Sequence, residues 1–233
     1  MSGDGRFSNT NDLVLSNASS KLLLNSITVD NVSTSVDSLG LDVDANSTVT
    51  SLTVGHTTPV SIADGITLSG GIAVTAGSIK LGEAGTLGST VSMSGGTLDA
   101  DETLTLSGAL SHTADITIDV KAGEVLTYSG AAVGLGAKTL TLSGGGTFSN
   151  TNAFVLNNAS SKLLLNSITV GKVSTSLASL GLDVDANSTV SNLTVGHTTP
   201  VSIGSGITLS GAITVTGGSI KLDEAGTLGS TVT

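Results

Sequence analysis

The sequence has no cysteine, no tryptophan and few other aromatic residues. Its 233 residues include only one tyrosine and three phenylalanines. Without cysteine the chain has neither disulfides nor thiol chemistry, which fits an exported protein. Large sandwiches and helical bundles usually fill part of their cores with aromatic rings, each burying ~150–250 Å². The core of this protein must therefore be built from aliphatic side chains in thin layers.

Basic residues are also scarce. Eight Lys and Arg stand against 18 Asp and Glu, which gives a net charge of -10. Phosphate groups repel a chain with this charge. Nucleic acid and anionic membrane surfaces are therefore excluded as expected partners. The apolar runs are far shorter than the ~18 residues of a membrane-spanning helix, so no membrane insertion is expected. The opening segment MSGDGRF lacks the basic and apolar regions of a secretory signal.

The chain repeats itself after 141 residues. Gly3–Ser92 aligns with Gly144–Thr233 without a gap, and 72 of the 90 aligned positions are identical. Repetition on this scale indicates a tandem array. It divides the chain into a first copy, residues 1–143, and a truncated second copy, residues 144–233, which we expect to form one continuous solenoid.

A shorter phrase recurs inside each copy. It consists of an apolar, a polar and an apolar residue followed by Ser-Gly, and it begins at Leu104, Leu126, Leu140 and Ile207. Such phrases predict short strands that are each ended by a glycine turn. Because almost no segment has helical periodicity, the predicted fold class is all-β.

Several segments change phase in the middle. In segment 21–29, KLLLNSITV, the even-numbered leucines up to Leu24 share one face, whereas Ile27 and Val29 continue on odd numbers. A shift of one residue would turn the apolar side chains to the wrong side of a strand. A bend at residues 25–26 restores their direction. Repeated corners with inward aliphatic residues predict a chain wound about an apolar axis.

We therefore predict a parallel β-solenoid. Coils of roughly 20–25 residues would give about ten coils, stacked ~4.8 Å apart. The alternative is a string of immunoglobulin-like sandwiches, which usually run ~100 residues and contain a buried Trp or a corner Tyr. The longer repeat and the absence of Trp favour the solenoid.

The phrase TLTLSGGGTFSN (Thr139–Asn150) and its relatives resemble the repeats of bacterial autotransporter passengers and filamentous-haemagglutinin-like adhesins. The resemblance covers nearly the whole chain, but it lies in composition and rhythm and not in a specific motif. It implies a right-handed parallel β-helix and an extracellular location on a bacterial cell surface. The chain departs from complete members of that family because it shows no signal peptide, secretion domain or membrane barrel.

The phrase LGLDVDANSTV, which occurs at 39–49 and 180–190, spaces acidic and amide residues like the opening of a calcium-binding EF-hand loop. The candidate ligands are Asp42, Asp44, Asn46, Asp183, Asp185 and Asn187. However, Ser47 replaces the required glycine and Thr53 replaces the final glutamate. If Leu39 and Val43 point inward, the aspartates lie on a solvated strand, and this interpretation is favoured over calcium.

The remaining candidates for catalysis are sparse. His56 and His197 stand in identical VGHTTPV phrases, where a turn before proline is the favoured role. The densest acidic group, Asp99, Asp101 and Glu102, could supply a general acid, but it is interpreted as an exposed turn. No catalytic residue and no cofactor are therefore predicted.

Thr-x-Thr pairs, the pattern of ice-binding solenoids, occur at places that look scattered along the chain. They include Thr48/Thr50, Thr103/Thr105, Thr139/Thr141 and Thr214/Thr216. Outward threonine is favourable in any strand, so these pairs need no special function.

The sequence and the resemblance together predict a structural or adhesive rod segment of a large repetitive bacterial surface or secreted protein. Its expected partners are a surface protein or glycan of a host or neighbouring cell, or another copy of itself bound head to tail. The alternatives are a self-assembling β-solenoid fibre subunit, an ice-binding solenoid and a polysaccharide-active β-helix.

Overall fold

The computed structural model describes residues 1–222 and 225–233, which form 28 strands and no helix. The predicted all-β class is confirmed. Nowhere in these ranges is there a helix with the length and apolarity of a membrane span. The chain divides into two compact units, unit 1 (Met1–Thr113) and unit 2 (Ala114–Thr233), which we describe separately.

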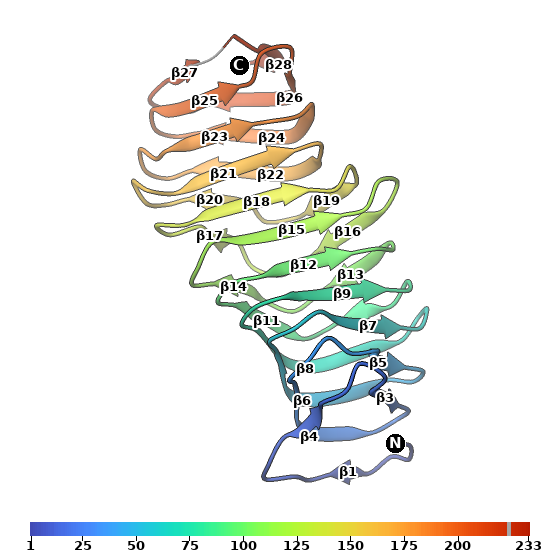
Figure 1. Cartoon of the computed structure of the whole chain (residues 1–233). Coiled ribbons are helices and arrows are strands. Elements are labelled where there is room, and N and C mark those ends of the chain that lie inside the picture. The colour runs from blue at the N-terminus through green and yellow to red at the C-terminus, as the bar shows by residue number, and fades with distance from the viewer. Residues whose placement is uncertain (223–224) are drawn as a thin grey trace. The chain divides into compact units, whose positions relative to one another are not determined.

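Unit 1 consists of a straight sheet with one strand per coil and a bent sheet that turns a corner within each coil (Figure 1). The straight sheet contains β3 (Lys21–Leu24), β5 (Gly40–Val43), β7 (Thr58–Ile62), β9 (Ser78–Gly82) and β12 (Thr97–Ala100). The bent sheet contains β1 (Arg6–Phe7), β2 (Leu13–Leu15), β4 (Thr28–Thr34), β6 (Ser47–Val54), β8 (Thr67–Val74), β10 (Thr86–Leu87), β11 (Thr90–Met93), β13 (Leu104–Leu106) and β14 (Leu110–His112).

Unit 2 has the same two kinds of sheet. The straight sheet contains β15 (Ile116–Val120), β18 (Thr139–Ser143), β21 (Lys162–Asn166), β23 (Gly181–Val184), β25 (Thr199–Ile203) and β27 (Ile220–Leu222). The bent sheet contains β16 (Val125–Tyr128), β17 (Val133–Gly134), β19 (Thr147–Asn150), β20 (Phe154–Leu156), β22 (Thr169–Thr175), β24 (Ser188–Val195), β26 (Thr208–Val215) and β28 (Thr227–Val232).

Within each unit, successive strands of a sheet pair in parallel, one coil after another. The partner residue lies 19 positions later in Lys21↔Gly40 and 24 positions later in Ile116↔Leu140, and other coils have similar lengths. In each unit the chain follows the straight sheet on the near side from left to right and returns behind it while rising (Figure 1). The coils are therefore right-handed, and the predicted parallel β-solenoid is confirmed.

Aliphatic columns run through the interior of the coils. In unit 1, Leu22, Leu41, Val60 and Leu81 occupy successive places of one such column, and all are buried. Like side chains stack on like because every coil places an apolar residue at the same register position. This arrangement gives close packing without large rings, as the composition requires.

The bend predicted at residues 25–26 is present. Ser26 has a φ of 50°, and its counterpart Ser167 has a φ of 55°. Both φ values lie in the left-handed region, where a non-glycine residue turns the chain sharply. In unit 1 the corner redirects the chain so that Leu24 and Val29, on either side of it, are both fully buried.

One inward residue was assigned wrongly. Leu39 was expected inside with Val43, but 54% of its surface is exposed, and Leu180 in the second copy is 58% exposed. Leu39 directly precedes β5, whose first residue, Gly40, has a φ of 78° that breaks the alternation. Leu41 and Val43 point inward as expected and are buried.

The few aromatic residues gather in unit 2. The rings of Tyr128 and Phe148 lie 6.1 Å apart, and those of Phe148 and Phe154 lie 5.0 Å apart. All three side chains are buried, and the Tyr128 hydroxyl donates a hydrogen bond of 2.8 Å to the Ala131 carbonyl. The fourth ring, Phe7, is 42% exposed.

The compact units do not coincide with the sequence copies. Unit 1 ends at Thr113 and unit 2 begins at Ala114, whereas the second copy begins at residue 144. Packing in a solenoid follows coil neighbours, so a division by compactness need not follow a division by sequence repetition. One continuous solenoid across both copies stays a prediction.

Candidate functional site

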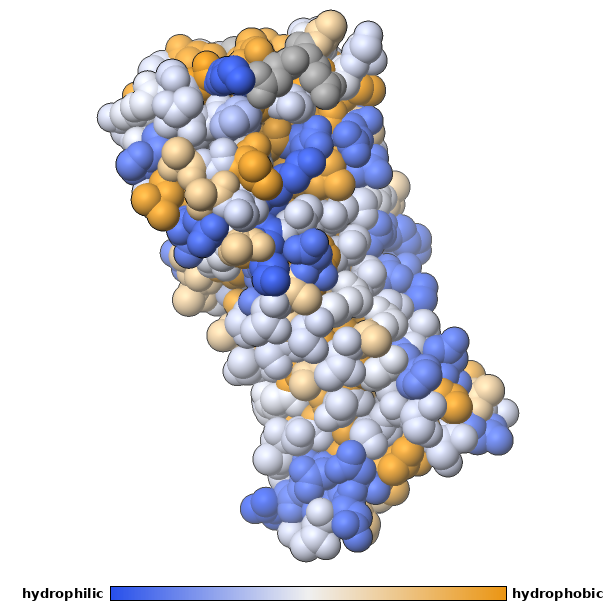
Figure 2. Space-filling model, turned by 60° about the vertical axis from the view of Figure 1, so that its left-hand side comes forward, coloured by the Kyte–Doolittle hydropathy of each residue, from blue (hydrophilic) through white to orange (hydrophobic). Residues whose placement is uncertain are grey.

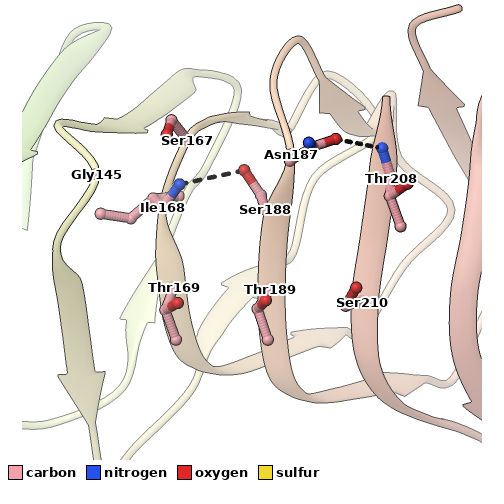
Figure 3. Close-up of a pocket in the computed structure, with 9 residues that line it drawn as sticks. All are labelled: Gly145, Ser167, Ile168, Thr169, Asn187, Ser188, Thr189, Thr208 and Ser210. Carbon is pink, nitrogen blue, oxygen red and sulfur yellow. Dashed lines mark hydrogen bonds between the residues drawn. The ribbon is translucent and has the colours of Figure 1, made fainter. Parts of the chain in front are cut away.

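A shallow open depression of about 300 Å³ lies on unit 2, at the corner where the chain enters the bent sheet (Figure 3). Its lining is almost entirely hydroxyl and amide groups. The lining residues are Gly145, Ser167, Ile168, Thr169, Asn187, Ser188, Thr189, Thr208 and Ser210. We call this depression the hydroxyl trough.

Three neighbouring strands supply the base of the trough. Thr169 on β22 pairs with Thr189 on β24, and Thr189 pairs with Ser210 on β26. Their side chains lie side by side across the strands (Figure 3). Since residues in register on parallel strands are ~4.8 Å apart, the trough presents one hydroxyl group per coil.

Hydrogen bonds inside the chain fix the wall of the trough. The Ser188 hydroxyl accepts a bond of 3.2 Å from the Ile168 amide and donates one of 2.9 Å to the Ala186 carbonyl. The side-chain carbonyl of Asn187 accepts a bond of 2.8 Å from the Thr208 amide of the next coil. These bonds hold the turn, so the trough is preformed.

Five other hydroxyl groups of the trough have no hydrogen-bond partner within the described part of the chain. They belong to Ser167, Thr169, Thr189, Thr208 and Ser210. Each remains available to donate and accept bonds with water or with a ligand. No lining residue of this trough is ionisable, so its recognition chemistry is neutral.

An equivalent depression of about 210 Å³ lies on unit 1. It contains Ser26, Thr28, Asn46 and Thr48, which are the counterparts of unit 2 residues after the 141-residue repeat. The same wall is present, because Asn46 accepts a 2.8 Å bond from the Thr67 amide. One lining residue differs in charge, since Asp4 stands where the second copy has glycine.

The calcium candidates lie in different surroundings. A 2.7 Å ion pair joins Asp42 to Lys21, and one of 2.6 Å joins Asp183 to Lys162. The hydrogen bond to the Asp42 carboxylate raises the pKa of the Lys21 ammonium. The side-chain carbonyl of Asn46 accepts a hydrogen bond from the Thr67 amide.

Asp44, Asp185 and Asn187 are exposed on turns, and the Asn187 carbonyl is bound to the Thr208 amide. Within residues 1–222 and 225–233, no three or more His, Asp or Glu side chains are grouped so that they could hold a metal ion.

The histidines and the acidic group are also separated. His56 lies in the turn before β7, as expected, with its Nδ1 4.0 Å from the Asp37 carboxylate. His112, on β14, lines a smaller depression of about 140 Å³ in unit 1. Asp99 is not part of an exposed turn, because it lies on β12 and forms a 2.9 Å ion pair with Lys80.

The spacing of Thr-x-Thr pairs in the sequence does not predict the rows of threonines that the structure contains. The Thr-x-Thr pairs named above fall on different parts of the coils, but single threonines align in register. In unit 1, Thr67, Thr86 and Thr105 form one row on the bent sheet. In unit 2, Thr147, Thr169 and Thr189 form another. The missed signal was a single Thr directly before an inward apolar residue, recurring about once per coil.

Comparison with known protein families, curated proteins and solved structures found no match to this chain.

Proposed function

We propose that the chain is a structural segment of a large repetitive protein on, or secreted from, a bacterial cell, where stacked coils space or display a binding region. The observation that carries this proposal is the in-register stacking of aliphatic columns in each unit. This architecture lengthens by one coil without changing its neighbours. The resemblance of the Ser-Gly phrases to adhesin repeats and the lack of cysteine support the extracellular location.

A non-enzymatic role accompanies this proposal. The lining of the hydroxyl trough offers neither a general acid nor a general base. Asp99 and Asp42, which the sequence places among acidic candidates, are each tied to a lysine. These ion pairs support a structural use of the acidic residues.

A whole-coil deletion tests the spacer role. In unit 1, Ser78 pairs with Thr97 and Thr86 pairs with Thr105, so both sheets advance by 19 residues at this coil. Removing residues 78–96 should therefore preserve every inward position and shorten the stack by ~4.8 Å. Removing only residues 78–87 breaks this register and should unfold unit 1.

The absence of native cysteine permits clean labelling for this measurement. Fluorophores on Asn11→Cys and Ser107→Cys, both exposed positions of unit 1, should report a shorter distance in the 19-residue deletion. Circular dichroism should show unchanged β structure. A whole-coil deletion that unfolds the protein, or that leaves the distance unchanged, would contradict the spacer role.

Head-to-tail self-association is the second candidate function. Apolar residues of the first and last coils are exposed where their counterparts in the other copy are buried. Phe7 is 42% exposed and Val232 is 50% exposed, whereas Phe148 and Val91 are fully buried. Exposed strand edges with apolar side chains favour pairing with another chain.

A further inference from the structure

The chemistry of the hydroxyl trough defines the class of ligand that it fits. Its free hydroxyl groups and the Asn187 amide both donate and accept hydrogen bonds. Sugar hydroxyl groups have the same dual character. A ligand without polar groups would displace the water bound to these donors and acceptors without replacing its hydrogen bonds, which opposes binding.

The lack of charge in the trough restricts the class of ligand further. The trough of unit 2 has no ionisable lining residue, so a charged ligand would find no counter-ion there. The net charge of -10 also repels anionic polymers at a distance. The trough therefore suits a neutral ligand better than a sulfated or carboxylated one.

The geometry favours a chain-like ligand over a small molecule. Small-molecule pockets are concave and bury most of their ligand, whereas this trough is shallow and open across three strands (Figure 3). Thr169, Thr189 and Ser210 repeat the same group at each coil along the stacking direction. A polymer lying across the strands would meet an equivalent hydroxyl group at every coil.

We propose that the hydroxyl trough binds a neutral polysaccharide chain that lies across β22, β24 and β26. The equivalent depression of unit 1, around Thr28 and Thr48, is a second site, which also carries the Asp4 carboxylate. Each contact is weak. Once one contact has formed, the rest of the polymer is held near the protein at a high effective concentration, so several contacts together increase the overall affinity. This inference rests on the proposed function, because it gives an adhesive surface segment its ligand class.

The test is affinity electrophoresis of the full chain in gels that contain one soluble polysaccharide each. The neutral probes are a β-1,3-glucan, a mixed-linkage β-glucan and a galactomannan, and the anionic probe is alginate. Wild-type protein should be retarded by at least one neutral polysaccharide and not by alginate. The double variant Thr48→Val with Thr189→Val removes one hydroxyl group from each depression and keeps the branched side chain.

This double variant should weaken binding about tenfold, since each lost hydrogen bond is worth ~0.5–1.5 kcal/mol. The matched control is Thr53→Val with Thr194→Val, which changes the same strands, β6 and β24, beyond the corner of the bent sheet. The control should bind within twofold of wild type, and thermal melting should show that both double variants are folded.

Three results would overturn the inference. They are no retardation by any neutral polysaccharide, equal retardation of both double variants, and retardation by alginate alone. Shaping of ice crystals by a protein that binds no polysaccharide would assign the threonine rows to ice instead. The deletion test of the spacer role uses no ligand, so a failure of polysaccharide binding leaves its result unaffected.

Discussion

At the scale of single residues, two glycines decide how closely neighbouring coils approach. Gly40 and Gly181 have φ values of 78° and 86°, in the left-handed region. A Cβ atom on Gly40 would lie 1.8 Å from the Pro59 carbonyl oxygen, and one on Gly181 would lie 1.9 Å from that of Pro200. Glycine is required here for two reasons, the backbone conformation and the lack of space.

Gly40→Ala should therefore destabilise unit 1 by roughly 3 kcal/mol or more, since the clash adds to the conformational cost. Gly65→Ala is the matched control, because Gly65 has a φ of 71° but nothing within 4 Å of the added carbon. It should cost only about 1–2 kcal/mol. Urea denaturation measures both, and equal losses would show that the carbonyl contact does not matter.

A second feature at the scale of single residues is an ion pair that is present in the first copy and absent from the second. The Arg6 guanidinium lies 2.6 Å from the Asp30 carboxylate, which also accepts a 2.7 Å bond from the Ser8 hydroxyl. In the second copy these charged positions are Thr147 and Gly171. Both charges are absent together, so neither is left without its partner.

The ion pair between Arg6 and Asp30 predicts a pH dependence of stability that is confined to the first copy. The hydrogen bonds from Ser8 and Arg6 lower the pKa of Asp30 below its ordinary value of 3.8. A lowered carboxyl pKa stabilises the fold above pH ~4, and this stabilisation is lost as the pH falls through the folded-state pKa. The gap in melting temperature between wild type and Arg6→Thr with Asp30→Gly should therefore shrink on acidification below pH ~4. A gap that stays constant from pH 6 to pH 3 would contradict this assignment.

At the scale of the coil, side chains on one turn hold the backbone of the next. Asn46 accepts a bond from the Thr67 amide, Asn187 from the Thr208 amide and Asp115 from the Thr139 amide, each at 2.8 Å. Corners interrupt the regular ladder and leave backbone amides that need an acceptor. A short amide or carboxylate side chain one coil away supplies it.

Asn46→Ala should thus leave the Thr67 amide without its acceptor and cost about 1 kcal/mol. Hydrogen exchange followed by NMR should show the Thr67 amide becoming less protected while the interior of β6 keeps its protection. Asn46→Asp retains an acceptor oxygen and serves as the control. If Asn46→Ala and Asn46→Asp exchange alike at this amide, the cross-coil bond is not what protects it.

At the scale of the whole chain, charge opposes the association that the exposed apolar residues of the terminal coils favour. The net charge is -10 and the isoelectric point is near 4.3. Salt screens this repulsion, with a Debye length of ~30 Å at 0.01 M and ~8 Å at 0.15 M.

Sedimentation velocity should therefore show larger species as salt is raised at pH 7, and again as the pH approaches 4.3 at low salt. Phe7→Lys, which charges the exposed edge at β1, should reduce both effects. A mass that is independent of salt and pH would argue against head-to-tail self-association.

The sequence by itself determined the fold class and the inward columns. Alternating aliphatic residues and recurrent glycine phrases leave few other ways to bury this chain, and the bend at Ser26 could be read from the change of phase alone. The sequence pattern gave the wrong side for Leu39, because the left-handed conformation of Gly40 depends on the coil that packs against it.

Only the tertiary structure decided which outward residues meet. Coil lengths vary from 19 to 24 residues, so spacing alone does not say that Arg6 faces Asp30 or that Thr169 stands beside Thr189. Register is set by pairing between coils, whereas the sequence pattern specifies only which side of a strand faces the core. The hydroxyl trough is a product of that register, and for this reason it is visible only once the coils are stacked.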